Sequence, residues 1–307
     1  TPSSRNSPDD TELIVQATEG ITIPDVSDDE LRFLDDSGDI QLVADANTDG
    51  IGNLRMVDVQ DSLRASGRDI DISGVNITLG GVDTSSVNLE DEGDISISTI
   101  SDDIRTRDLD SSSDLSSGDI GDGGAITISS TSGNISTQSL NSSSYSSRGQ
   151  TRNGGDITLS SISGNISTQG LDSSSYSFSE DSGNGGKITI SSTSGDVRTQ
   201  YLDSSSLSIG GNSRRGGNII ITSTFGNIST QSLNSSSLTD NFPWRSEDGG
   251  DITISSTSGN ISTQDLNSSS ISPYGDIGEG GAITISSTSG NIRTQSIKSK
   301  SDSESGD

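Results

Sequence analysis

A phrase of 23 residues recurs along this chain at a nearly fixed distance. The phrase GGAITISSTSGNISTQSLNSSSY occupies residues 123–145 and returns in edited form five more times. Its second glycine falls at 124, 155, 186, 217, 250 and 281, so the step is 31 residues four times and 33 once. A fixed period of this length is typical of a solenoid, in which each repeat packs only against its neighbours.

Looser copies precede the regular ones and bring the number of unit starts to nine, with the first three at 38, 68 and 93. We therefore divide the chain into an N-terminal segment (1–37), degenerate coils (38–122), regular repeats (123–298) and a polar tail (299–307). The N-terminal segment has a polar start and short apolar runs typical of strands, and could serve as a cap or an assembly arm. Ser27 followed by Glu30 fits a helix N-terminus, so a helical turn is expected over 28–34.

Within a regular unit the residues alternate as they do in strands. Apolar residues at every second place in 125–129 predict a strand with one buried face. Residues 135–138 and 140–145 are expected to form a second and a third strand, and the variable stretch that follows is expected to be a surface loop. Ser, Thr, Ile and Asn dominate the units, which disfavours helical repeats.

Three short strands cannot bury their inner face alone, but coils stacked at a rise of ~4.8 Å would place equivalent residues above one another. Four inner ladders then follow, and they start at Ile126, Ile128, Ile135 and Leu140; Tyr145 would start a fifth, looser one. The first ladder comprises Ile126, Ile157, Ile188, Ile219, Ile252 and Ile283. We therefore predict an all-β, right-handed parallel β-helix of about nine coils, with the hand taken from the general rule for parallel crossovers.

Composition alone would indicate disorder, because only 25% of the residues are hydrophobic and the net charge is −28. The constant phase of the isoleucines argues against that interpretation. The chain has no cysteine or histidine, which excludes disulfides and histidine-based catalysis. The acidic balance argues against a nucleic-acid partner, and no apolar run approaches the length of a membrane span.

One loop has part of a calcium-binding pattern. Asp45, Asn47 and Asp49 stand at positions 1, 3 and 5 of the stretch DANTDG, with Gly50 at position 6, as in the front half of an EF-hand loop. Position 12 is Met56, so the bidentate carboxylate is missing. An Asn/Asp/Gly turn between two strands has the same composition, and no other cofactor is expected.

The variable loops contain the unusual side chains. Phe242, Trp244 and Arg245 lie in the 33-residue unit, and Tyr274 lies at the same phase of the next unit. Exposed aromatic residues beside arginine are typical of a patch that binds sugar or protein. The alternative is that they fold over the edge of the coil and cover it. Loop arginines such as Arg214 and Arg215 are expected to pair with loop carboxylates.

Columns of Asn134 and Gln138 equivalents recur outside the ladders, and we interpret them chiefly as structural amide ladders and turn residues rather than as a binding face. Parallel β-helices also include enzymes that act on polysaccharides, with paired carboxylates as catalysts. The carboxylates of this chain are scattered through loops, and no pair recurs beside a lysine. We therefore expect no enzymatic activity.

The phrases GGDITISSTSGNISTQDLNSSS and ADANTDGIGNLRM resemble the repeats of large filamentous-haemagglutinin-like exoproteins, especially the cyanobacterial type, over roughly residues 38–297. The resemblance implies a β-helical shaft outside the cell, exported by two-partner secretion through an outer-membrane barrel transporter, with a role in adhesion or matrix. No secretion domain or charged-then-apolar leader is evident, which we interpret as a processed or internal portion.

Two functions follow as expectations. The first is an extracellular structural shaft or fibre subunit on the cell surface, with head-to-tail self-stacking that covers the strand edges at both ends. The second is an adhesin that binds glycan or a partner surface through its loops.

Overall fold

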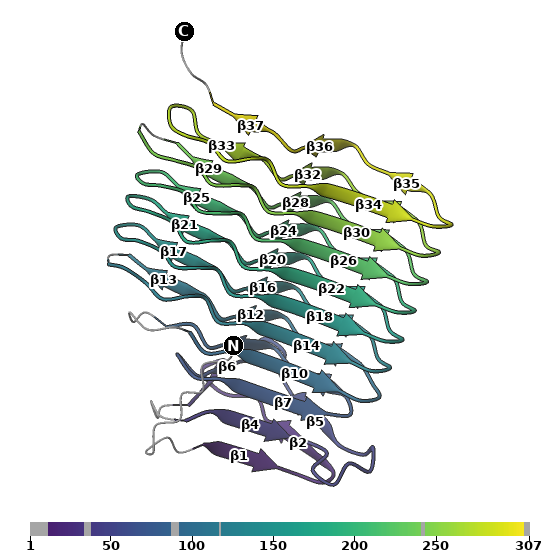
Figure 1. Ribbon diagram of the computed structural model, residues 1–307. Coiled ribbons are helices and arrows are strands. Elements are labelled where there is room, and N and C mark those ends of the chain that lie inside the picture. The colour runs from purple at the N-terminus through teal and green to yellow at the C-terminus, as the bar shows by residue number, and fades with distance from the viewer. Residues whose placement is uncertain (1–11, 34–37, 87–91, 117, 241–242, 304–307) are drawn as a thin grey trace.

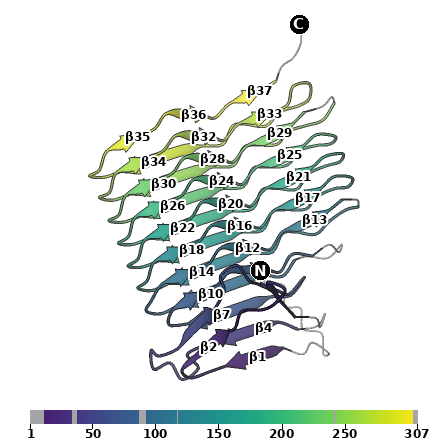
Figure 2. The ribbon, with the colours of Figure 1, turned by 180° about the vertical axis from the view of Figure 1, so that it is seen from behind.

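The computed structural model describes residues 12–33, 38–86, 92–116, 118–240 and 243–303. These residues form an all-β parallel solenoid of about nine coils, and they contain no helix. Each turn of the chain adds one rung to the stack, from the first rung near β1 to the last near β37 (Figure 1). The view from behind shows the same strands stacked in the same order, from β1 to β37 (Figure 2). The predicted fold class is confirmed.

Three sheets of ten strands run the length of the stack, and we call them sheets A, B and C. Sheet A consists of β1 (Leu13–Gln16), β4 (Ile40–Val43), β7 (Ile70–Gly74), β10 (Ile95–Thr99), β14 (Ile126–Ser130), β18 (Ile157–Ser161), β22 (Ile188–Ser192), β26 (Ile219–Ser223), β30 (Ile252–Ser256) and β34 (Ile283–Ser287). Sheet B consists of β2 (Gly20–Ile23), β5 (Asn53–Met56), β8 (Ile77–Thr78), β11 (Ile104–Arg105), β15 (Ile135–Ser136), β19 (Ile166–Ser167), β23 (Val197–Arg198), β27 (Ile228–Ser229), β31 (Ile261–Ser262) and β35 (Ile292–Arg293). Sheet C consists of β3 (Glu30–Arg32), β6 (Ser62–Arg64), β9 (Gly81–Asp83), β12 (Asp108–Asp110), β16 (Ser139–Asn141), β20 (Gly170–Asp172), β24 (Tyr201–Asp203), β28 (Ser232–Asn234), β32 (Asp265–Asn267) and β36 (Ser296–Lys298).

A fourth sheet of seven strands, sheet D, accompanies the later rungs. It consists of β13 (Ser113–Leu115), β17 (Ser144–Ser146), β21 (Ser175–Ser177), β25 (Ser206–Ser208), β29 (Ser237–Thr239), β33 (Ser270–Ile271) and β37 (Ser301–Asp302). The expectation of three strands per regular unit is therefore wrong. The stretch 140–145 bends after Asn141, so its two halves belong to sheets C and D.

The N-terminal segment contributes a rung of its own. Strands β1, β2 and β3 pair in parallel with β4, β5 and β6, ahead of the nine repeat starts read from the sequence. The helical turn expected over 28–34 is wrong for Glu30–Arg32, which form β3 because they pair with Ser62–Arg64 of the next rung; residue 34 lies outside the described residues.

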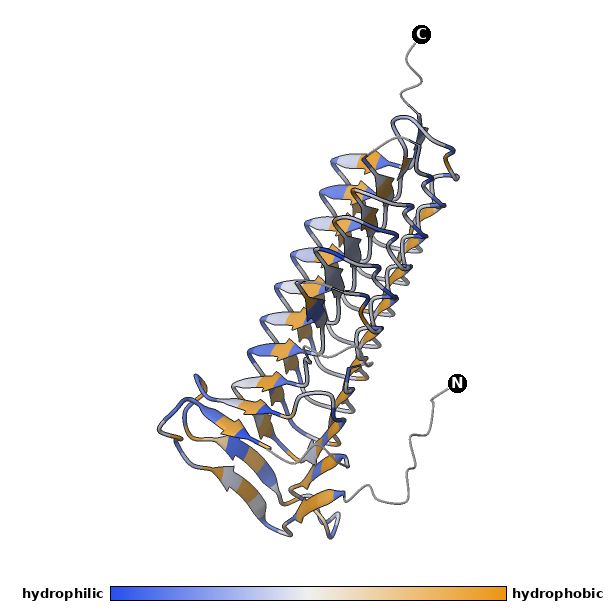
Figure 3. Ribbon diagram, turned by 90° about the vertical axis from the view of Figure 1, so that its left-hand side faces the viewer, coloured by the Kyte–Doolittle hydropathy of each residue, from blue (hydrophilic) through white to orange (hydrophobic). Residues whose placement is uncertain are grey.

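The predicted isoleucine ladders are confirmed by the strand register. Ile126 pairs with Ile157 and Ile157 with Ile188, and the same register continues to Ile283. Ile126 and Ile157 are fully buried, as are Ile135 and Leu140. The hydrophobic segments therefore recur at the same place on successive strands (Figure 3).

The column that starts at Tyr145 was expected inside the coil but lies on its outer face. Ser144 and Ser146 point inward and are fully buried, whereas Tyr145 between them is half-buried. Tyr145 contacts Tyr176 of the next rung, with ring centroids 5.2 Å apart. The interior is thus apolar along sheets A, B and C and lined by serine along sheet D.

The doubled glycine of the repeat is required by close contact between rungs. A Cβ atom on Gly155 would lie 2.2 Å from both the Gly124 carbonyl oxygen and the Ser142 hydroxyl oxygen. The Ser142 hydroxyl donates to the Gly124 carbonyl across the coil, and Ser111 and Ser299 make the same bond to Gly93 and Gly281. This hydrogen bond connects opposite sides of the coil without using an apolar side chain.

Candidate functional site

The variable loops between sheets D and A gather along one edge of the stack (Figure 1). We call them the loop edge; their described residues are 116, 118–125, 147–156, 178–187, 209–218, 240, 243–251 and 272–282. The two extra residues of the 33-residue unit fall in 240–251, because Ser246 bridges Ser213 of the preceding loop and restores the register. The most variable part of the repeat is thereby placed on one continuous surface.

Inward serines of sheet D hold these loops in place. The hydroxyls of Ser144, Ser177 and Ser206 donate to the carbonyls of Gly121, Gly149 and Gly183 at 3.0, 2.8 and 2.7 Å, respectively. Buried hydroxyls also bond from rung to rung and form a chain in which neighbouring oxygens lie 2.8 to 3.1 Å apart. This chain comprises Ser182, Ser206, Ser213, Ser237, Ser246 and Ser270. Because a buried hydroxyl without a partner is costly, the bonds fix the loop backbones to the stack.

The predicted aromatic patch lies on this edge. The Ser272 hydroxyl donates to the Trp244 carbonyl at 3.0 Å, and the Arg245 amide donates to Asn212 Oδ1 at 3.0 Å. Tyr274 of the next loop is 58% exposed, whereas Trp244 is half-buried. Trp244, Arg245 and Tyr274 thus come from adjacent rungs, and Phe242 lies outside the described residues.

Charged side chains pair between loops of the edge, as expected from the sequence. Arg215 contacts Asp248 at 2.5 Å, and Arg214 lies 4.0 Å from Glu247. All four side chains are substantially exposed, so each pair contributes only about 0–1 kcal/mol to stability. The pairs therefore contribute little to the stability of the fold.

Shallow polar hollows lie between the ordered loops. One of about 540 Å³ is lined by Arg215, Asp248, Asp251 and Glu279, among other residues, and one of about 210 Å³ lies beside Arg245. A third, of about 360 Å³, is lined by residues 150–153 and 181–184 and by Arg214. Carboxylates, amides and guanidinium groups at these hollows can bond to hydroxyl groups of a polar ligand.

The loop predicted to bind calcium is a compact turn between β4 and β5. Asp45 accepts hydrogen bonds from the amides of Asp49 and Gly50 at 3.2 and 3.1 Å, and Asp49 accepts from Asn47 Nδ2 at 2.7 Å. Thr48 and Gly50 both have positive φ. These bonds are those of an aspartate-capped turn, and the calcium prediction for this loop stays a prediction.

The two amide columns differ. Asn165 donates from its backbone amide and from Nδ2 to Asn134 Oδ1, at 2.9 and 3.1 Å, and the pattern repeats with Asn291 on Asn260. The structural interpretation is confirmed for this column. The glutamines bond through their backbones, as Gln169 does to Gln138 at 3.0 Å, and they are exposed except for the half-buried Gln231.

One buried carboxyl group stands out. Glu92 is 7% exposed and lies beside the Ser113 hydroxyl and the Ser86 backbone, although neither of its oxygens has a partner at full hydrogen-bond geometry among the described residues. Burial raises the pKa of Glu92 to about 8, against the smaller lowering effect of Ser113. The carboxyl is therefore neutral at mildly acidic pH.

A cluster of three carboxylates was not predicted from the sequence. The group consists of Asp25, Asp58 and Asp61. Asp58 and Asp61 follow Asp25 by 33 and 36 residues, and all three lie in the two most divergent rungs, where the repeat phrase does not align. The offset of 33 that pairs Ile23 with Met56 is the signal that could have found Asp25 and Asp58.

Comparisons with protein-family models, with curated proteins and with solved structures found no match for this chain. What the fold defines is the class: a β-helical repeat protein built as a parallel solenoid. The described residues contain no helix long and apolar enough to cross a membrane.

Proposed function

We propose that this protein is an extracellular structural shaft that stacks end to end with further copies of itself, in the manner of filamentous-haemagglutinin-like exoproteins. The observation that carries the proposal is the apolar last rung. Ile292 and Ile297 are 45% and 51% exposed, whereas Ile261 and Leu266, at the same positions one rung earlier, are each 1% exposed.

The first described rung offers a matching surface. Leu13, Ile14 and Val15 of β1 are 39 to 47% exposed, and sheets A, B and C each end there with an open strand. A parallel rung from a second copy would continue these three sheets and cover apolar side chains at both ends. The proposal assigns no catalysis to the chain, and export through an outer-membrane barrel transporter belongs to the same proposal.

Sedimentation velocity and negative-stain electron microscopy at ~0.15 M salt test the stacking. The expected result is filaments or ladders of oligomers that disappear in the variant Ile292→Lys/Ile297→Lys. Tyr201→Lys is the matched control, because Tyr201 is 59% exposed on the flank of the stack rather than at its end. A wild-type protein that stays monodisperse at all concentrations would refute the stacking.

A second function, adhesion through the loop edge, is favoured by the exposed Tyr274 next to the Trp244 loop and by the polar hollow beside Arg245. Aromatic faces with neighbouring hydrogen-bonding groups are suited to glycans. Glycan-array binding that is lost in Tyr274→Ala and Trp244→Ala but kept in Phe178→Ala supports this function. Equal glycan binding by all three variants would exclude Trp244 and Tyr274 as the glycan-binding patch.

A further inference from the structure

The corner between sheets B and C differs at the N-terminal end of the stack. Regular rungs turn this corner with two residues, such as Thr137 and Gln138 between β15 and β16. The first two rungs use longer loops, residues 24–29 between β2 and β3 and residues 57–61 between β5 and β6. The added residues bring three aspartates of adjacent rungs together.

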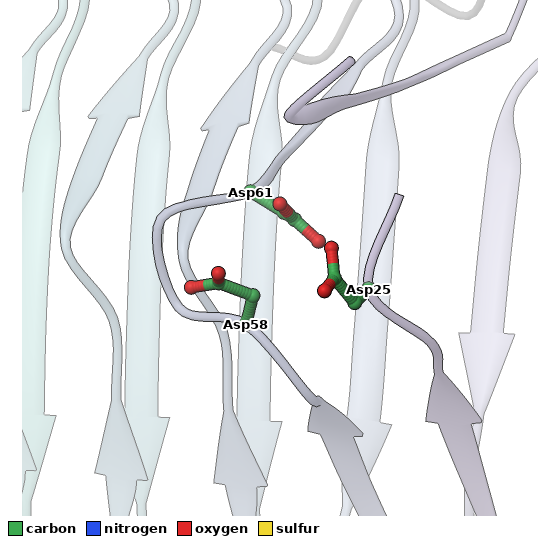
Figure 4. A group of neighbouring side chains, drawn as sticks. All are labelled: Asp25, Asp58 and Asp61. Atoms are coloured by element: carbon green, nitrogen blue, oxygen red, sulfur yellow. The ribbon is translucent and has the colours of Figure 1, made fainter. Parts of the chain in front are cut away.

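Asp25, Asp58 and Asp61 each place a carboxylate oxygen within 4.8 Å of the others. Figure 4 shows the Asp25 and Asp61 carboxylates directed toward each other, with Asp58 on the same loop as Asp61. Two oxygens bound to one Ca²⁺ can lie up to about 5 Å apart, since each Ca–O distance is about 2.3–2.6 Å. The spacing of the three carboxylates is therefore that of ligands around one ion.

Asp61 provides the second observation. Its side chain is fully buried, and one oxygen accepts a hydrogen bond from the Val26 amide at 3.1 Å. The other oxygen, Oδ1, is buried and has no hydrogen-bond partner among the described residues. A buried carboxylate oxygen without a partner costs free energy, and two neighbouring carboxylates increase that cost by repulsion.

The three carboxylates have no basic partner in the described part of the chain. Within the described residues, no ion pair joins Asp25, Asp58 or Asp61 to a lysine or an arginine. Arg107 approaches the 57–61 loop but donates to the amide oxygen of Gln60. The charge at this corner thus lacks a partner within the described part of the chain.

We propose that Asp25, Asp58 and Asp61 bind a divalent cation, Ca²⁺, which ties the first rung to the second. Carboxylate oxygens, completed by water on the exposed Asp25 side, are ligands that Ca²⁺ accepts. The site is separate from the Asp45 loop, which lies at the corner between sheets A and B.

Calorimetric titration of CaCl₂ into the chelator-treated full chain tests the proposal. We expect a Kd of about 0.1–1 mM, as in weak extracellular calcium modules, weakened at least tenfold in Asp61→Asn. Asparagine keeps an oxygen for the Val26 amide, so the loop is expected to stay folded. Asp28→Asn removes one carboxylate charge from the 24–29 loop that carries Asp25, outside the cluster, and is expected to bind calcium as the wild type does.

Three further measurements make the outcome decisive. Asp25→Asn, at an exposed position, repeats the test without touching the interior. Asp45→Asn distinguishes the Asp45 loop from the three-aspartate cluster as the calcium site. Calcium binding that is lost in Asp45→Asn and kept in Asp61→Asn overturns the proposal. A titration that releases no heat of binding up to about 10 mM CaCl₂ also overturns it. A thermal midpoint that rises with CaCl₂ in the wild type but not in Asp61→Asn or Asp25→Asn supports it.

Discussion

Asn165 lies directly above Asn134, although 31 residues separate them, and it donates both its backbone amide and its side-chain amide to the single oxygen Asn134 Oδ1. Asn165 in turn accepts from the Asp196 amide at 2.8 Å. The column therefore links rungs at a corner where sheets A and B separate.

Replacing Asn165 by alanine is expected to lower the free energy of unfolding by about 1 kcal/mol, because the variant loses a side-chain bond on each side of its rung. The control is Gln169→Ala in the same rung, whose exposed side chain takes no part in the column. Urea unfolding followed by circular dichroism measures both variants. Equal losses would contradict a specific role for the asparagine column.

Gly155→Ala is expected to destabilise the protein by about 3 kcal/mol or more, because its Cβ would lie 2.2 Å from two oxygen atoms in the packed interior. Gly170→Ala is the matched control in the same rung, since nothing lies within 4 Å of its Cβ position. There the loss of unfolded-chain entropy predicts a gain of about 0.4–1 kcal/mol. Thermal melts of both variants test the contrast, and similar melting temperatures would refute it.

Glu92 is expected to make stability depend on pH. Its pKa rises from 4.5 in the unfolded chain to about 8 on folding, so both states hold the proton below pH 4.5. Between these values only the folded state holds it, and stability falls as pH rises. Glu92→Gln should therefore match the wild type at pH 4 and exceed it by about 2 kcal/mol or more at pH 8. Urea titrations across this range test it, and a difference independent of pH would contradict it.

Asp172 and Asp203 pair directly across rungs. Burial raises the pKa of Asp172, and the Asp203 charge adds to the effect. Asp172→Asn keeps an acceptor for Ser174, as Asn141 does for Ser143. It should stabilise the protein at pH 7 by about 0.5–1 kcal/mol, and the gain should vanish below the unfolded pKa of 3.8 because aspartate is then neutral in both states. Asp265→Asn, at an exposed position, is the control for charge alone, and an equal gain there would contradict the pairing effect.

The isoleucine ladders could be predicted because the sequence shows both the alternation of apolar residues at every second position and the 31-residue repeat. The inward-facing serines could not be predicted, because the run Ser142-Ser143-Ser144 has no polar–apolar alternation that would indicate which side chains face the interior. The bend after Asn141 decides which residues face inward, and it turns Tyr145 out.

The candidate site was predicted in part for a related reason. Trp244, Arg245 and Tyr274 share one edge because their phase within the repeat is shared. Asp25, Asp58 and Asp61 escaped notice because their loops interrupt the repeat, and only the pairing of β2 with β5 reveals that they are neighbours.

The uniform register of the regular rungs has an evolutionary consequence. Residues 155–185 form one whole period, and the strands before and after it present the same edges to their neighbours. Deleting that period in frame would bring the rung of Ile126 directly against the rung of Ile188 with every ladder intact, and duplicating it would add one step. Gene length and rod length are therefore coupled in units of a single coil, so unequal recombination can change the reach of the molecule without a new fold having to be invented.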